Sequence, residues 1–168
     1  MEASTRRWGG LVFFIVLCFA TAWAGAGATS RSLAWYAALR KPSWTPPNWL
    51  FGPVWSILYL MMAIAAWRVW ERNGLSGARQ ALALFFVQLA LNGAWPWLFF
   101  AMRSPGAGFA DIVVLWVAVL ATTVSFWVRD RVAGGLMVPY LVWVSYAAAL
   151  NFAIWRMNWG LYDRPWRI

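Results

Sequence analysis

Five long uncharged stretches alternate with short charged segments along the chain. They cover residues 8–30, 42–67, 80–102, 112–128 and 132–155. Each is close to or above the roughly 17–25 residues that a helix needs to cross a bilayer. Lipid cannot hydrogen-bond an open sheet edge, so spanning segments of this composition are helices. The pattern therefore predicts an all-α membrane protein built as a five-transmembrane-helix bundle.

We expect one domain over residues 1–168, with helices at about 8–28, 48–70, 78–101, 108–128 and 134–156. All connections except the first are short, so consecutive helices are expected to be antiparallel neighbours. No internal repeat is visible, which gives no support to an inverted-repeat transporter. The first stretch also resembles a secretory signal peptide, because two arginines precede an apolar core that ends in small residues. Cleavage there would leave four helices.

The first connection is unusual in length and composition. Residues 35–55 hold four tryptophans, four prolines and the basic pair Arg40 and Lys41. Proline restricts the backbone, so this loop is expected to be stiff and structured. Two interpretations remain open: a lid over one end of the bundle, or an anchor at the membrane interface, where Trp, Lys and Arg accumulate.

Composition and charge narrow the possible functions. The chain is 63% hydrophobic and carries a net charge of +9. Its arginines lie between apolar runs, so lipid headgroups are expected as their partners and nucleic acid is not. Seven basic residues fall on each side of the predicted membrane, which leaves the orientation undetermined. There is no histidine, Cys18 is the single cysteine, and the acidic residues are scattered, so neither a metal site nor acid–base catalysis is expected.

Polar and aromatic side chains form stripes on three predicted helices. Helical spacing places the following residues on one face of the third helix: Gln88, Asn92, Trp95 and Phe99. The second and fifth helices carry Trp55, Tyr59 and Met62, and Trp143, Ala147 and Asn151. Amides within a membrane indicate either a functional site or hydrogen bonds between helices. If the stripes converge, they form an apolar pocket with a few polar groups, as small-molecule sites do; otherwise they are core packing.

Several segments resemble the translocator protein family, also called tryptophan-rich sensory proteins or peripheral benzodiazepine receptors. The resemblance lies in residues 35–55, in Gln88 to Pro96 followed by Phe99-Phe100, in Pro139 to Trp143, and in Leu150-Asn151. It implies a five-helix bundle that forms homodimers, with a pocket closed by the first loop. It also implies an intact first helix and an integral membrane location: the cell membrane in a bacterium, or the mitochondrial outer membrane in a eukaryote.

The resemblance further implies a ligand and its site. Expected ligands are tetrapyrroles such as protoporphyrin IX, sterols and isoquinoline carboxamides, with no cofactor required. The expected ligand-binding residues are Tyr36, Pro46, Trp55, Tyr59, Asn92, Trp95, Trp143 and Ala147. Trp55 and Trp143 match tryptophans linked in this family to light-dependent porphyrin breakdown. Phe152 replaces a tyrosine of the animal members' sterol-recognition segment, which weakens the case for a sterol there.

Three functions are compatible with this pattern. The first is a membrane sensor that binds a tetrapyrrole between Trp55 and Trp143, with Asn92 as a polar contact and Arg40 and Lys41 facing its carboxylates. The second is photo-oxidative degradation of the porphyrin by those two tryptophans. The third is transport of a porphyrin or sterol.

Overall fold

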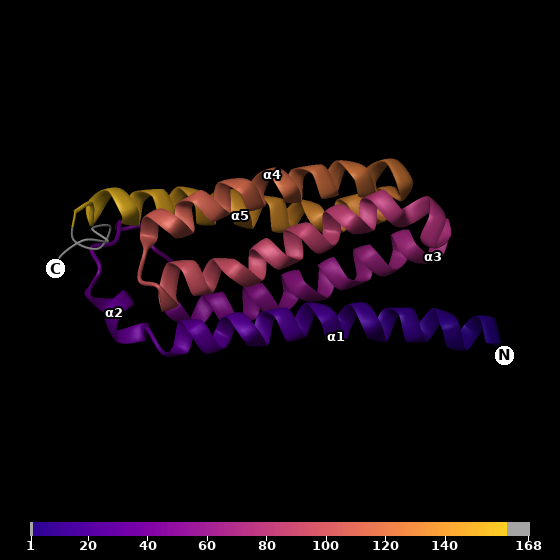
Figure 1. Ribbon diagram of the computed structural model, residues 1–168, viewed down its shortest axis with the longest axis horizontal. Coiled ribbons are helices and arrows are strands. Elements are labelled where there is room, and N and C mark those ends of the chain that lie inside the picture. The colour runs from indigo at the N-terminus through magenta and orange to yellow at the C-terminus, as the bar shows by residue number, and fades with distance from the viewer. Residues whose placement is uncertain (1, 161–168) are drawn as a thin grey trace.

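The computed structural model describes the backbone of residues 2–160 and the side chains of residues 7–160. Every regular element in that part of the chain is helical (Figure 1). In chain order these are α1 (Glu2–Ser30), α2 (Leu33–Ala38), α3 (Asn48–Pro96), the π-helical turn η1 (Trp97–Ala101), α4 (Pro105–Arg129) and α5 (Arg131–Met157). The predicted all-α membrane bundle is confirmed.

Helix α3 crosses the bundle twice, because the chain reverses direction at Gly74 (Figure 1). We call residues 48–73 its first arm and residues 75–96 its second arm. Gly74 has φ 63° and ψ −179°, a backbone conformation open almost only to glycine. Two helices joined by a short connection were expected here, but the expected loop between residues 70 and 78 is too long. The residues on both sides of Gly74 are helical, and the connection is this one glycine. With η1, α3 forms a 54-residue apolar segment, long enough for two of the five crossings.

The other connections are short and capped by side chains. Ser104 accepts a hydrogen bond from the Ala107 amide and begins α4. Asp130 alone separates α4 from α5, and its carboxylate accepts hydrogen bonds from the amides of Val132 and Ala133 at 2.8 and 3.3 Å. Such caps satisfy the amides that a helix N-terminus leaves free. The α4–α5 hairpin is consequently tighter than the sequence indicated.

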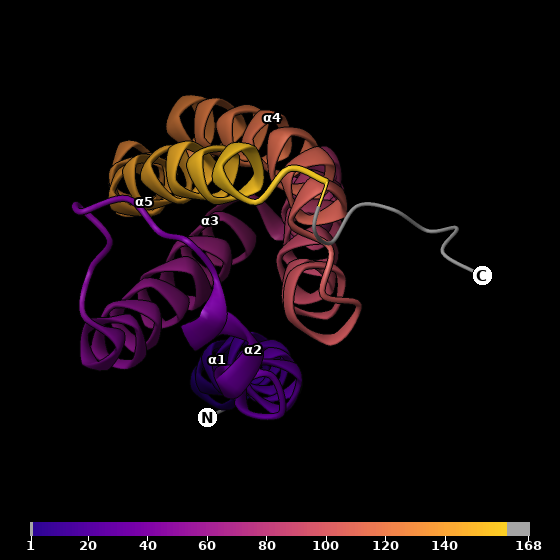
Figure 2. The ribbon, with the colours of Figure 1, turned by 90° about the vertical axis from the view of Figure 1, so that its left-hand side faces the viewer.

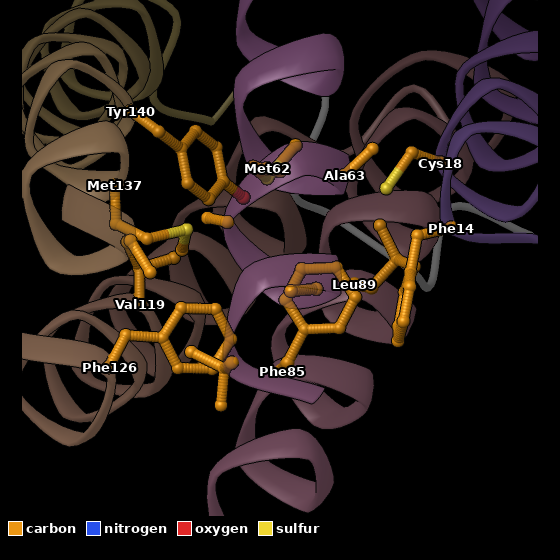
Figure 3. Close-up of a cluster of buried hydrophobic side chains, with 14 of the residues drawn as sticks. Phe14, Cys18, Met62, Ala63, Phe85, Leu89, Val119, Phe126, Met137 and Tyr140 are labelled. Atoms are coloured by element: carbon orange, nitrogen blue, oxygen red, sulfur yellow. The ribbon is translucent and has the colours of Figure 1, made fainter. Parts of the chain in front are cut away.

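The helices pack around a core that receives side chains from all five crossings. Helix α1 packs on α3, while α4 packs on α5 and on α3. The core side chains drawn in Figure 3 include Phe14, Cys18, Met62, Ala63, Phe85, Leu89, Val119, Phe126, Met137 and Tyr140. Large apolar side chains such as Trp23 and Val124 instead face outward. In a bilayer this exposed apolar surface contacts lipid.

The two ends of the bundle differ. At the end where α3 reverses, Arg68 and Arg72 both pair with the buried Asp130, at 3.0 and 3.2 Å, and Arg7 pairs with Glu71. At the opposite end, α2 and residues 39–47 cross over the helices (Figure 2). We call residues 39–47 the cover loop. The aromatic side chains of Trp35, Tyr36, Phe99 and Phe100 pack beneath this region.

Candidate functional site

A cavity of about 630 Å³ lies in the bundle at the end covered by α2. Its wall receives residues from α1, α2, both arms of α3, η1, α4 and α5. Most of the lining atoms are carbon, with amide and indole groups interspersed. Both the size and this character fit a small-molecule site, for which about 300–1,000 Å³ is usual.

The structure brings together seven of the eight predicted site residues. They line the cavity from four helical segments: Tyr36 of α2, Trp55 and Tyr59 of the first arm of α3, Asn92 and Trp95 of its second arm, and Trp143 and Ala147 of α5. The eighth, Pro46, lies in the cover loop and is not part of the cavity wall. The three predicted stripes thus converge, while ligand contact by these residues stays a prediction.

Asn92 is the polar centre of the inner wall. The Tyr59 hydroxyl donates a hydrogen bond to its side-chain oxygen, and Asn92 Nδ2 donates to the Tyr140 hydroxyl at 2.8 Å. These bonds join both arms of α3 to α5. Gln88, one helical turn away, is fully buried outside the cavity wall, and its Nε2 lies 4.0 Å from the sulfur of Met62. Of the two amides predicted on the third helix, only Asn92 faces the cavity.

Trp55 and Trp143 form an aromatic corner in the cavity wall. Their ring centroids lie 6.5 Å apart and the ring planes are nearly perpendicular, at 89°. Trp55 also contacts the ring of Tyr59 at 5.5 Å, and Phe51 contacts Trp143 at 5.9 Å. The indole N–H of Trp143 is buried and has no hydrogen-bond partner among the described residues. A buried donor of this kind favours a ligand that brings an acceptor.

A second amide of the cavity wall, Asn151, holds the Trp95 side chain in place. Its Oδ1 accepts a hydrogen bond from Trp95 Nε1 at 3.0 Å, and its Nδ2 donates to the Pro105 carbonyl at 2.8 Å. The Trp95 ring is in turn stacked on Phe99 at 5.0 Å. Trp95 is thereby fixed in one orientation between α3 and α5.

The cover loop is fastened to α5 at two points. Asn158 accepts a hydrogen bond from the Arg40 amide and donates one to the Arg40 carbonyl, at 3.1 and 2.9 Å. Tyr146 donates to the Trp44 carbonyl at 2.8 Å, and the Tyr146 and Trp44 rings are in contact. The sequence indicated neither fastener: Asn158 lies just beyond a span, where a polar residue carries no pattern of its own, and Tyr146 is one more aromatic residue of the fifth helix. They support the lid interpretation of this loop.

Lys41 of the cover loop contacts Tyr36 of α2. The Lys41 ammonium donates to the carbonyls of Tyr36 and Leu39 at 2.7 and 3.0 Å, and it lies 4.8 Å from the Tyr36 ring centroid. Lys41 therefore closes the end of α2, whereas the Arg40 side chain is exposed. Burial, together with a smaller effect of Tyr146, raises the pKa of the Tyr36 hydroxyl, so it stays protonated as a donor at neutral pH.

Comparison with known proteins identifies the family. Residues 14–156 match the model of the TspO/MBR family. Protein CrtK of Rhodobacter capsulatus is 45% identical over 155 residues, covering 89% of this chain and 95% of the relative. The tryptophan-rich protein TspO of Chlorobaculum tepidum is 44% identical, covering 88% and 95%. The human translocator protein is 42% identical over 132 residues, covering 77% and 78%. The chain is an integral membrane protein and belongs to the TspO/MBR family.

Proposed function

We propose that this protein binds a tetrapyrrole, with protoporphyrin IX as the representative ligand, in the cavity beneath the cover loop, and that it acts as a membrane sensor. The observation that carries the proposal is the convergence of Trp55, Trp143 and Asn92 on one largely apolar cavity. A flat aromatic macrocycle gains stacking and edge contacts against two perpendicular indoles. Relatives named tryptophan-rich sensory protein, such as that of Cereibacter sphaeroides, are consistent with a sensory role.

Individual groups have distinct proposed tasks. Trp143 offers its indole N–H, which has no partner among the described residues, to an acceptor on the ligand. Asn92, an amide of the cavity wall that two tyrosines hold in place, is the proposed polar contact. Arg40, exposed at the cover loop, is proposed to pair with a carboxylate of the ligand. A guanidinium binds a carboxylate through two parallel hydrogen bonds. The sterol and isoquinoline-carboxamide ligands implied by the resemblance are proposed as competitors for the same space.

Quenching of tryptophan fluorescence by protoporphyrin IX, titrated in the dark on the purified protein, tests the proposal. We expect saturable quenching by the wild type, with weaker affinity for Asn92→Ala. Trp127→Phe is the matched control, since Trp127 is an exposed indole outside the cavity wall. Quenching that never saturates, or that is indifferent to Asn92→Ala, would mean that porphyrin only partitions into the micelle, and the proposal would fail.

Light-dependent breakdown of the bound porphyrin is a second candidate, favoured by the position of Trp55 and Trp143 in the same cavity wall. An indole within contact distance of an excited macrocycle is placed to donate an electron to it, and dioxygen would be the terminal oxidant. We expect illumination in air to bleach the porphyrin with the wild type and not with Trp143→Phe. Equal loss of binding and bleaching in that variant would reduce the role of Trp143 to binding.

The homodimer is also proposed rather than observed. The small residues Ala90, Gly93 and Ala94 suit close helix packing. Gly93 already packs against Thr21 of α1 within the same chain, at 3.0 Å from its Cβ position, whereas Ala90 is exposed. A dimer through this face would therefore use the Ala90 side of the second arm.

A further inference from the structure

The exposed part of the cavity wall is confined to one side of the bundle. Eight lining residues are exposed, and all belong to α1, α2 or the first arm of α3: Phe19, Trp23, Ala26, Ser30, Leu33, Asn48, Gly52 and Ser56. Every lining residue of the second arm, η1, α4 and α5 is buried or half-buried. The cavity is therefore closed towards α4 and α5 and open between α1 and the first arm of α3.

Contacts along α1 explain where this opening begins. Near the reversal end, α1 touches the first arm: Trp67 Nε1 donates to the Arg7 carbonyl at 3.0 Å, and Trp70 packs directly on Gly10. The ring contact between Phe19 and Tyr59, at 6.5 Å, is the last of this series. Beyond it, α1 stays packed on the second arm, which Phe14 already contacts through Phe85, and Gly25 lies against Pro96 at 3.0 Å. The two helices that border the cavity therefore separate after Phe19.

The opening lies at the depth of the hydrocarbon. From Ser30 back to Phe19 there are eleven helical residues, or about 17 Å of rise. One leaflet of the hydrocarbon core is about 15 Å thick. Small side chains border both edges, with Ala26 on α1 and Gly52 and Ser56 on α3. A Cβ built at Gly52 would meet no atom within 4 Å.

Access through the cover loop would require more disruption. The loop is fastened to α5 by the hydrogen bonds of Asn158 and Tyr146, and Lys41 ties it to α2. A molecule that reaches the cavity between α1 and the first arm breaks none of these bonds. Resting on the proposed function, we infer that the ligand reaches the cavity sideways from the bilayer, through a portal between α1 and the first arm of α3. The ligand class is thereby a membrane-dissolved, flat amphiphile.

Blocking the portal after folding tests this route. Gly52→Cys places a thiol in open space at the portal, and the protein can be modified with N-cyclohexylmaleimide in detergent and then reconstituted in phospholipid vesicles. Gly9→Cys is the matched control, because Gly9 is an exposed α1 glycine with equally open surroundings outside the cavity wall. Cys18 is fully buried, so treated wild type reports any background reaction.

Stopped-flow quenching by protoporphyrin IX predissolved in the vesicles gives the result. A blocked route slows association and dissociation together by about tenfold and leaves Kd unchanged, because a portal alters rates and not the bound state. Modified Gly9→Cys keeps the wild-type rates. Doubling the lipid at fixed porphyrin is expected to halve the association rate, since the bilayer is the source.

Other outcomes overturn the portal. Unchanged rates after modification of Gly52→Cys would exclude it, as would faster dissociation alone, which would place the label in the site and not on the route. Faster association and dissociation in Asn158→Ala, with no effect of the label, would assign access to the cover loop. If the wild type shows no saturable quenching, the proposed function itself has failed; saturable binding that ignores the label removes the portal alone.

Discussion

Asn92 and Gln88 are both buried amides on the second arm of α3, and their surroundings differ. Asn92 has hydrogen bonds to two tyrosine hydroxyls, whereas the side-chain oxygen of Gln88 has no hydrogen-bond partner among the described residues. A buried polar group that loses its partner costs about 1–3 kcal/mol, while removing one that already lacks a partner costs little. Substitutions at the two positions should therefore have opposite effects.

We expect Asn92→Leu to lower the free energy of unfolding by at least about 1–3 kcal/mol, because it strands the hydroxyls of Tyr59 and Tyr140. Gln88→Met is close in volume and removes the unpartnered carbonyl, so it should be neutral or stabilising. Denaturant or thermal unfolding in detergent, followed by circular dichroism, measures both. Equal destabilisation by the two substitutions would contradict this account of the network.

The sequence identified both amides by the same signal, a polar residue inside an apolar helix, and could not separate them. Whether each amide finds a hydrogen-bond partner depends on which side chain of a facing helix lies opposite it. Tyr59 and Tyr140 meet Asn92, whereas Met62 meets Gln88. Pro46 shows the same limit, because Tyr36 and Pro46 were both expected at the site and only Tyr36 lies in the cavity wall. Residue type was predictable at this scale, and the partner was not.

At the scale of elements, the reversal of α3 depends on one backbone conformation. Gly74 has φ 63° and ψ −179°, and a Cβ there would meet no atom within 4 Å. Gly74→Ala should therefore destabilise the protein through backbone strain alone, by about 1–3 kcal/mol. Gly135 in α5 also has open surroundings but lies within a helix, so Gly135→Ala should stabilise by about 0.5–1 kcal/mol.

Unfolding midpoints of Gly74→Ala and Gly135→Ala, measured alongside the wild type, test both predicted changes in stability. If Gly74→Ala were as well tolerated as Gly135→Ala, the left-handed residue would not be needed for the reversal.

The existence of the two arms was visible in the hydrophobic pattern. The predicted connection between residues 70 and 78 contains Gly74, but the shortness of the turn was not visible, because polar residues next to Gly74 such as Arg72 and Asn73 continue a helix as readily as they end one.

The α4–α5 hairpin depends on Asp130, which caps α5 and pairs with Arg68 and Arg72. Burial alone would raise its pKa, but hydrogen bonds from Arg68 and the backbone amides, with the charge of Arg68, outweigh burial and hold the pKa below its usual value. A depressed pKa means that the pairing stabilises the fold above the unfolded pKa of about 3.9. That contribution is lost as pH falls from there through the lower folded pKa.

Asp130→Asn separates the charge from the cap, because asparagine caps a helix about as well as aspartate. We expect the variant to be less stable than the wild type at pH 7, and the gap between them to narrow as pH falls below about 4, where the unfolded carboxylate becomes protonated. Unfolding midpoints at several pH values measure the gap. A constant gap down to pH 3 would show that the ion pairs contribute nothing.

At the scale of the whole molecule, the cover loop is held across the end of the bundle that contains the cavity. Its two fasteners, Asn158 and Tyr146, both come from the C-terminal part of the chain and reach the loop more than 100 residues away in sequence. Hydrophobic periodicity places the helices but contains no information on such long-range contacts. The five-helix architecture was therefore predictable, while the closure of the site was not.

Asn158→Ala should release the cover loop without unfolding the bundle, since within residues 7–160 the side chain bonds only to Arg40 and to the Ile154 carbonyl. Limited trypsin digestion reports this release, because the Arg40–Lys41 bond is cleavable and Pro42 protects the bond after Lys41. We expect cleavage after Arg40 to accelerate in Asn158→Ala, with an unchanged unfolding midpoint. Met157→Ala, an exposed neighbour on the same turn, should digest like the wild type. Equal protection in both variants would mean that Tyr146 and Lys41 hold the loop by themselves.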